Sequence, residues 1–352
     1  MGYRCLKVKV PPANPTRGRR PPGLLASRPR CGYPDRTLIR PAALRPGDVV
    51  RVVAPAGPVD PEPLERGVSV LREEFGLRVH VRPDVTARRG YLAGEDARRL
   101  QEWHEAASDL ECRALFCARG GYGSMRLLPR LEPARLLHPP KWVVGFSDVT
   151  AIHCALNQAG LVTIHGPVVA QLGSCTAEAR SHLRALLFGR GDAPPPGSHF
   201  PRIGGGVLGT AVIRPGSASG TLLGGSLCLL SHLCGTPWLP RMAGAVLLIE
   251  DVAEKPYKLD RYLTQLRLSG TLDGVRGVCV GHLTDCDHAG QHGADVVREL
   301  VRALGVPAIE GLPVGHEDGN FALPLGAIVT VIAPAPGEEG PPRLIFEQGP
   351  VV

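Results

Sequence analysis

The chain has 352 residues, of which 43% are hydrophobic and 21% are charged, and its formal net charge is +7. That hydrophobic share excludes a mostly disordered protein, and the length suggests two domains, each large enough to bury a core. No apolar run approaches the roughly 18 residues that a membrane-spanning helix needs, which excludes a spanning protein.

The positive charge is concentrated at the start of the chain. Residues 1–39 contain nine Lys and Arg residues against one acid, whereas the remaining 313 residues contain 31 basic and 32 acidic ones. The segment also has seven prolines and no periodic pattern, so we predict a disordered extension without a specific role. The alternative is an arm that binds nucleic acid or another anionic surface.

The ten cysteines contain no C-x-x-C pair, and no secretory signal is recognisable at the start of the chain. These features favour reduced thiols in a cytoplasmic protein.

Strand-like and helix-like segments alternate over the first half of the chain. Short apolar runs predict strands at 48–55, 77–81, 114–118, 141–146 and 161–165. Helical spacing predicts helices between them, and Ser147 or Asp148 is expected to cap the one that ends at Gly160. This alternation is typical of a parallel sheet covered by helices.

The pattern breaks over residues 189–206, where Pro and Gly cluster as in a linker. Beyond it, short strands predominate, at 209–213, 245–249, 275–280 and 327–333, with one clear helix over 259–269. We therefore predict an α/β protein with an N-terminal parallel-sheet α/β domain (40–188) and a smaller β-rich C-terminal domain (207–352).

The most informative motif is the glycine-rich run at 118–126, ARGGYGSMR, which follows a predicted strand and precedes a helix-like segment. A strand, a tight turn and a helix make a nucleophile elbow, which would present Ser124 as the nucleophile. The backbone amides of Met125 and Gly121 would be the oxyanion donors. A phosphate cradle and a purely structural turn are the alternatives, although the G-K-[ST] that marks a P-loop is absent.

A serine nucleophile needs a base and an acid that orients it. Glu250 ends a predicted strand, and His316 lies in a loop rich in Gly and Pro. The order Ser, acid, His occurs in known triads. A surface ion pair for Glu250 and an ordinary loop position for His316 remain the alternatives.

Several blocks of sequence, in order, resemble the LD-carboxypeptidase family of serine peptidases. They are GGYGS with RLLP at 120–129, KWVVGFSDVT at 141–150, GGSL at 224–227 with GTP at 235–237, IEDV to EKPY at 249–257, and GH at 315–316 with LPLG at 323–326. The resemblance spans about residues 41 to 346. It departs from the family at Ser226, where Asn is more common, so no role is carried over to that position.

The resemblance implies a catalytic triad of Ser124, Glu250 and His316, located at the junction of the two domains, in a homodimer without metal or cofactor. It also implies an enzyme that cleaves the amide between an L-diamino acid and a terminal D-alanine in peptidoglycan tetrapeptides during cell-wall recycling.

Two other functions remain open. A subgroup of the family hydrolyses peptidyl- or aminoacyl-adenylate antibiotics and would need an aromatic platform for adenine, for which Trp238 is a candidate. A non-catalytic nucleotide- or nucleic-acid-binding protein would instead hold phosphate in the glycine turn and a polyanion on the basic extension. A metal site among the His, Asp and Cys residues of 282–295 is disfavoured, because their spacing fits no standard zinc pattern.

Overall fold

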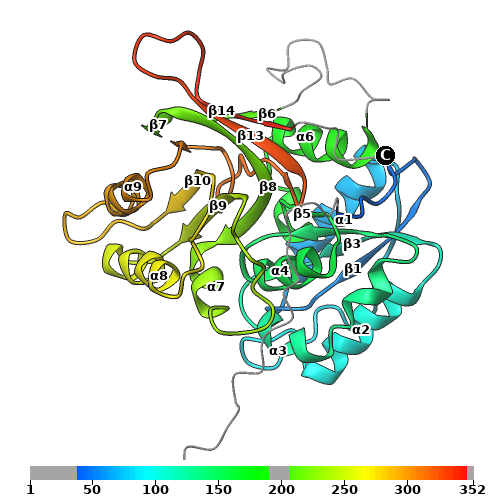
Figure 1. Ribbon diagram of the computed structural model, residues 1–352. Helices are drawn as coiled ribbons and strands as arrows, with labels where there is room; N and C mark the ends of the chain where they lie inside the picture. Colours follow the sequence, from blue (N-terminus) through cyan, green and yellow to red (C-terminus); the bar gives the residue numbers. More distant parts are fainter. Residues whose placement is uncertain (1–37, 190–205, 347–352) are drawn as a thin grey trace, which may run out of the picture. The chain divides into compact units, whose positions relative to one another are not determined.

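The first of two β-sheets is built mainly from the N-terminal half of the chain (Figure 1). The computed structural model describes residues 38–189 and 206–346. The sheet has the strand order β12-β5-β4-β3-β1-β2, and all neighbours are parallel except β12, which pairs antiparallel to β5. Its strands are β1 (Val49–Val53), β2 (Arg78–His80), β3 (Cys112–Cys117), β4 (Trp142–Gly145), β5 (Thr163–His165) and β12 (Leu323–Leu325).

The second sheet has eight strands, all from the C-terminal half, in the order β6-β14-β13-β8-β9-β10-β11-β7. Its centre, β8 to β11, is parallel, and its flanks are antiparallel. The strands are β6 (Gly206–Leu208), β7 (Ala211–Arg214), β8 (Gly216–Ser226), β9 (Ala245–Val252), β10 (Gly277–Thr284), β11 (Ala308–Glu310), β13 (Ile328–Ala333) and β14 (Arg343–Phe346).

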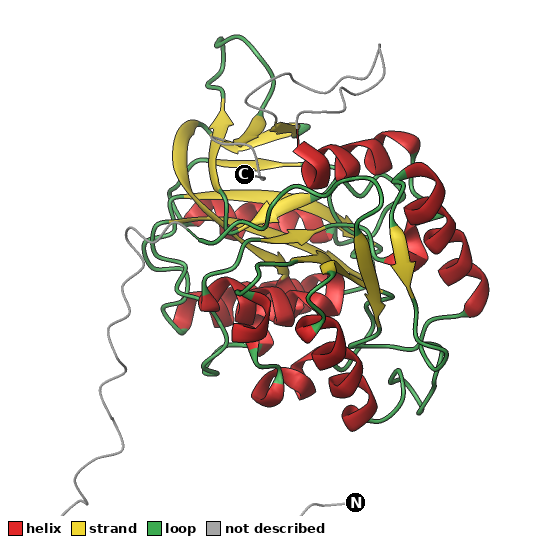
Figure 2. Cartoon of the chain, turned by 90° about the vertical axis from the view of Figure 1, so that its right-hand side faces the viewer, coloured by secondary structure: helices red, strands yellow, loops and turns green. Residues whose placement is uncertain are grey.

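Helices gather below and beside the strands in the view of Figure 2. The α-helices are α1 (Pro61–Ser69), α2 (Asp96–Ser108), α3 (Ser124–Leu127), α4 (Thr150–Ala159), α5 (Val169–Leu172), α6 (Ala177–Phe188), α7 (Leu227–His232), α8 (Pro256–Leu268) and α9 (Gly293–Ala303). A π-helical turn, η1 (Val70–Glu74), extends α1, and short 3₁₀ turns are formed by η2 (Leu128–Arg130), η3 (Pro133–Leu136) and η4 (Ser147–Val149).

The predicted fold class is confirmed, with a parallel-rich α/β sheet followed by a strand-rich second part. One helix of the second part, α7, was not predicted. The predicted linker at 189–206 falls almost wholly outside the described residues. The predicted extension of 1–39 is too long at its end, because Leu38 is buried and Ile39 forms a parallel bridge with Leu161.

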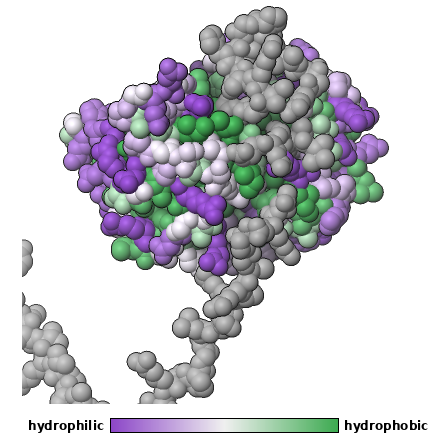
Figure 3. Space-filling model, turned by 45° about the horizontal axis from the view of Figure 1, so that its top comes forward, coloured by the Kyte–Doolittle hydropathy of each residue, from purple (hydrophilic) through white to green (hydrophobic). Residues whose placement is uncertain are grey.

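One hydrophobic cluster runs through both halves, so the two sheets do not have the separate cores that the chain length suggested. It includes Ile152 of α4, Leu223 of β8 and Leu259 of α8, all at most 7% exposed. In Figure 3 hydrophilic residues line both sides of the face shown, with hydrophobic ones between them. No helix within the described ranges is long and apolar enough to cross a membrane.

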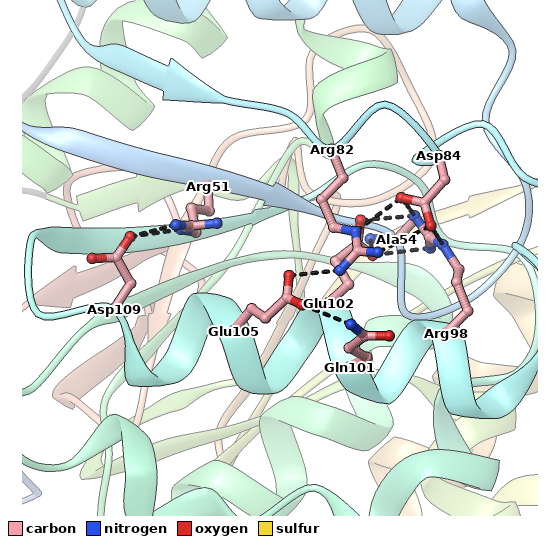
Figure 4. A network of polar contacts seen from close by, with 9 residues as sticks. All are labelled: Arg51, Ala54, Arg82, Asp84, Arg98, Gln101, Glu102, Glu105 and Asp109. Carbon is pink, nitrogen blue, oxygen red and sulfur yellow. Dashed lines mark hydrogen bonds and ion pairs between the residues drawn. The ribbon is translucent and has the colours of Figure 1, made fainter.

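A network of hydrogen bonds and ion pairs between acidic and basic side chains connects helix α2 to the first sheet (Figure 4). The buried carboxylate of Glu102 accepts the backbone N–H of Ala54 at 2.7 Å and a hydrogen bond from Arg98 at 2.9 Å. Burial raises the pKa of Glu102 despite these partners, because removal from water disfavours the charged form. This network positions α2. The residue after Arg98, the buried Arg99, donates a hydrogen bond from this helix to the carbonyl of Gly123 in the glycine-rich loop.

A matched pair of leucines tests the packing of the first sheet. Leu115, at the centre of β3, is fully buried, whereas Leu110, just before this strand, is 78% exposed. We expect Leu115→Ala to lower the free energy of unfolding by about 2–5 kcal/mol, because it leaves a cavity, and Leu110→Ala to change it by less than about 0.5 kcal/mol. Urea titration followed by circular dichroism measures both values, and equal losses in the two variants would contradict this packing.

Candidate active site

Ser147 occupies a sharp turn between a buried strand and a helix. Strand β4 ends at Gly145, Phe146 is extended, and Ser147 has a φ of +63° before the chain enters η4 and α4. A left-handed conformation at a residue other than glycine costs on the order of 1–3 kcal/mol and persists only where the surrounding structure enforces it. This geometry, with the sequence Gly145-Phe146-Ser147, is that of a nucleophile elbow.

His316 links this serine to a buried carboxylate. Its Nδ1 lies 2.9 Å from Oε2 of Glu250, and its Nε2 lies 2.9 Å from Oγ of Ser147. Because an ionised carboxylate only accepts hydrogen bonds, Nδ1 carries the proton, and Nε2 of the neutral ring is free to accept from the serine hydroxyl. The structure thus contains an unbroken Ser147–His316–Glu250 chain of hydrogen bonds.

The surroundings hold the imidazole in this orientation. Glu250, on β9, is fully buried, while the side chain of His316 keeps 18% of its surface exposed. The ring of Phe146 packs against the imidazole, with the ring centroids 4.7 Å apart. The acid is therefore shielded from water, whereas the base can still be reached by a substrate.

The loop that carries His316 is fixed from the opposite side by a buried amide. Asn320 accepts the backbone N–H of Gly315 at 2.9 Å and donates to Oε1 of Gln171 at 3.0 Å. Gln171, on α5, in turn donates to the backbone carbonyl of Glu317 at 3.0 Å. These bonds attach both ends of the short segment around His316 to the N-terminal half of the chain.

The glycine-rich loop lies directly against Ser147. A Cβ atom at Gly120 would come within 2.9 Å of Ser147 Cβ and 3.1 Å of Ser147 Oγ, so only glycine fits there without a shift. On its other side, the carbonyl of Gly120 accepts the backbone N–H of Gly57 at 2.9 Å. The motif that sequence reasoning singled out therefore borders the site, although not through its serine.

Ser124 is not the serine that His316 contacts, which contradicts the predicted pairing. Ser124 is fully buried at the start of α3, and its backbone N–H donates to Oδ2 of Asp148 at 2.7 Å. The hydrogen bond of His316 goes to Ser147 instead. The physical reason lies in the local backbone. Ser124 begins the helical turn α3 directly after the glycines, whereas Ser147 stands in a left-handed turn and its hydroxyl contacts His316.

The expected cap at Ser147 or Asp148 is also absent, since neither side chain caps α4, whose N-cap is Val149. The sequence did contain a signal that makes Ser147 a second candidate, although it does not decide between the two serines. A predicted strand ending in Gly-x-Ser and followed by a helix is the same context that favoured Ser124.

Comparisons with known proteins identify the family of this chain. Residues 50–166 match the model of the LD-carboxypeptidase N-terminal domain, and residues 219–331 match that of the LD-carboxypeptidase C-terminal domain. The chain belongs to the LD-carboxypeptidase family. This confirms the resemblance noted in the sequence and makes the chain a member of a serine-type peptidase family.

Curated relatives of this family align over most of their length. A putative carboxypeptidase of Synechocystis sp. is 37% identical over 298 residues, covering 83% of this chain and 94% of the relative. The murein tetrapeptide carboxypeptidase of Pseudomonas aeruginosa is 34% identical over 290 residues, covering 79% and 91%.

Solved structures of the family share the fold. The muramoyltetrapeptide carboxypeptidase of Oxalobacter formigenes superposes with a TM-score of 0.73 at 28% identity, covering 86% of this chain and all of the other. The microcin C7 self-immunity protein MccF superposes with a TM-score of 0.75 at 22% identity, covering 88% and 99%, a likeness that concerns the fold.

The remaining sequence candidates lie in ordinary structural roles. Trp238 packs partly buried against the hydrophobic core. Ser226 caps α7, where its Oγ accepts the N–H of Leu229 at 3.4 Å. In the polar segment 282–295, Asp287 bonds His292 at 2.7 Å and the N–H of Gly293 at 3.0 Å, at the start of α9. Within the described ranges no group of three or more His, Cys, Asp or Glu residues is arranged to hold a metal ion.

A phosphate cradle in the glycine loop is disfavoured by its existing partners. The backbone N–H of Ser124, which such a cradle would direct at the anion, already donates to the Asp148 carboxylate. A negative phosphate would have to displace a buried carboxylate or lie beside it. Helix α3 has only four residues and offers little additional dipole.

The pKa of Asp251, the residue after Glu250, provides a test of how strongly this site is buried. Asp251 is 4% exposed, and its carboxylate accepts the N–H of Cys228 at 2.7 Å. Burial, together with the nearby charge of Glu250, raises the pKa of Asp251 to about 7. Because the folded-state pKa lies above the unfolded one, the stability that the protonated form contributes is fully present below about pH 4 and is lost as the pH rises through about 7.

We therefore expect the free energy of unfolding to fall more steeply between pH 5 and pH 7.5 in the native protein than in Asp251→Asn, whose amide does not titrate. Urea titrations of both proteins across this range measure the two slopes. The comparison of slopes is insensitive to any constant loss of stability in the variant, and parallel slopes would contradict the shift.

Proposed function

We propose that this protein is a serine LD-carboxypeptidase that releases the terminal D-alanine from peptidoglycan tetrapeptides, at the amide that follows an L-diamino acid, in cell-wall recycling. The observation that carries the proposal is the chain of hydrogen bonds from Ser147 through His316 to Glu250. The names of the relatives support the substrate class, since the P. aeruginosa protein is a murein tetrapeptide carboxypeptidase. Neither a metal nor a cofactor takes part in this mechanism.

In the proposed reaction Ser147 takes the place that the sequence analysis gave to Ser124. Its Oγ attacks the carbonyl carbon of the scissile amide as its proton passes to Nε2 of His316. Glu250 accepts the hydrogen bond from Nδ1–H of His316 throughout and stabilises the imidazolium that forms, without itself becoming protonated. The tetrahedral intermediate then collapses, the C–N bond breaks, and His316 returns the proton to the nitrogen of the departing D-alanine.

The acyl-enzyme is released by the reverse sequence of proton transfers. His316 takes a proton from a water molecule, the hydroxide attacks the ester carbonyl, and Ser147 Oγ leaves with the proton. The negative oxygen of each intermediate needs backbone donors close to Ser147. We assign these to the N–H of Asp148, which follows the nucleophile, and to that of Gly121, which follows the glycine in contact with it. Met125, predicted to donate beside Ser124, is no longer adjacent to the attacking oxygen.

The adenylate-hydrolysing alternative would use the same serine, histidine and glutamate. It requires an aromatic side chain that can stack on adenine, and the candidate Trp238 packs against the core. No contact of the described residues favours it. The tetrapeptide is therefore our proposed substrate, and a competition assay with an aminoacyl-sulfamoyl adenosine distinguishes the two, because it would inhibit D-alanine release only if adenine is recognised.

We also propose a homodimer and a cytoplasmic location. The dimer rests on the family resemblance. The location is supported by the eight cysteines of the described ranges, all of which are free thiols. The substrate is a small muropeptide, and nucleic acid enters the proposal only as a possible contact of the basic extension.

Replacing each of the two serines in turn gives the decisive comparison of catalytic rates. We expect Ser147→Ala to lower the rate of D-alanine release by at least about 10³-fold, since it removes the attacking oxygen. Ser124→Ala should keep the rate within about tenfold, because the backbone N–H that contacts Asp148 remains. Release of free D-alanine from a tetrapeptide, measured by chromatography, gives both rates. Loss of activity in Ser124→Ala with full activity in Ser147→Ala would restore the original assignment.

Removal of the basic extension tests the non-catalytic alternative. All the side chains of the proposed mechanism lie after residue 38, so a chain that begins at Asp35 should release D-alanine with an unchanged kcat/KM. The same truncated chain and the full chain are compared for binding to a mixed-sequence oligonucleotide at several salt concentrations. A nucleic-acid-binding protein would instead lose a steeply salt-dependent affinity on truncation.

A further inference from the structure

The carboxylate of Asp148 is buried beside the proposed nucleophile, and the mechanism above uses only its backbone. The side chain is 3% exposed, and Oδ2 accepts the N–H of Ser124 at 2.7 Å. This bond joins the turn that carries Ser147 to the C-terminal end of the glycine-rich loop. Burial raises the pKa of Asp148, and the N–H of Ser124 acts against that shift.

The same loop is held on its far side by a buried arginine. Arg99, on α2, is fully buried, and its Nη1 donates to the carbonyl of Gly123 at 3.0 Å and to that of Pro55. A Cβ atom at Gly123 would lie 2.7 Å from this nitrogen, so the guanidinium packs directly against the loop backbone. Its Nη2 donates to Asp96 at 2.6 Å, which supplies a negative partner for the buried cation.

Three contacts therefore locate the short loop that contains the proposed oxyanion donor Gly121. At its start, Gly57 donates to the Gly120 carbonyl. At its end, Arg99 holds the Gly123 carbonyl, and Asp148 holds the Ser124 amide. A loop of four residues, three of them glycine, has many conformations of its own, so these contacts supply the order that its sequence does not.

We infer that Asp148 is a positioning residue, whose carboxylate oxygen holds the glycine-rich loop against Ser147 so that the oxyanion donors are in place before the substrate binds. This inference rests on the proposed function. Preorganised donors stabilise the transition state more than the ground state, so a displaced loop lowers kcat and leaves KM nearly unchanged. The arrangement needs an acceptor at the position of Oδ2 and does not need the negative charge.

Three substitutions at this position separate acceptor placement from charge. Asp148→Asn keeps an oxygen acceptor in place and loses the charge, whereas Asp148→Glu keeps the charge and moves it by one methylene. Asp148→Ala removes both. We expect kcat for D-alanine release to fall by about 10²–10³-fold in Asp148→Ala, which is the loss seen when an oxyanion donor is removed. The fall should be less than about tenfold in Asp148→Asn and intermediate in Asp148→Glu.

A second measurement makes the result independent of the natural substrate. A fluorophosphonate reacts with an activated serine: the Oγ–P bond forms, the P–F bond breaks, fluoride leaves, and the serine proton goes to His316. Its phosphoryl oxygen occupies the oxyanion position, so labelling of Ser147, located by peptide mass spectrometry, should slow in the same order as kcat. Thermal unfolding checks each variant, and Val301→Ala, in the remote helix α9, controls for destabilisation alone.

The outcomes separate the two proposals. If the native protein releases no D-alanine but labelling slows at least 100-fold in Asp148→Ala, the substrate is wrong and the positioning role stands. If Asp148→Ala keeps its labelling rate and kcat within threefold of the native protein, or if Asp148→Glu is more active than Asp148→Asn, the positioning role is overturned. If Ser147 of the native protein is not labelled, both proposals fall. If Asp148→Ala does not fold, the order of the Asn and Glu variants decides.

Discussion

The hydrogen bonds of His316 are the constraint on which the proposed chemistry depends. The imidazole must lie within 2.9 Å of a serine from one half of the chain and a carboxylate from the other. Its loop leaves β11 in the second sheet and enters β12, which completes the first sheet. Because the chain itself crosses between the sheets here, the relative placement of Ser147 and Glu250 is set by covalent connection as well as by packing.

The site also contains three buried carboxylates, which differ in their hydrogen-bond partners. Glu250 is paired with His316, which the mechanism converts to a cation at the step where charge is needed. Asp251, one residue on, contacts backbone amides instead of a cation, and its pKa rises to about 7. Asp148 is likewise bonded to an amide, that of the glycine-rich loop. Alternation along β9 places two adjacent acids in different surroundings, and only one of them faces the base.

The glycine-rich motif shows how a correct pattern led to a wrong residue. Its strand, turn and helix are present, and the loop does border the proposed nucleophile. The same local pattern recurs at Ser147, where a helix-capping role was expected because Ser and Asp are common at helix starts. Local propensity does not distinguish a cap from an elbow, since the difference is one left-handed residue, Ser147, whose hydroxyl contacts His316.

The sequence by itself determined the alternation of strands and helices, the parallel sheet and the family, because each is recorded in local periodicity or in contiguous motifs. Its motifs also proposed Glu250 and His316 as partners, and the structure places the two side chains 2.9 Å apart. It did not determine which serine meets the histidine. That depends on contacts between residues far apart in the chain, such as Ser147 with His316 and Ser124 with Asp148. Only the tertiary structure decided it, because hydrogen-bond partners at these separations are selected by how the two sheets and their connecting loop pack, which no local pattern encodes.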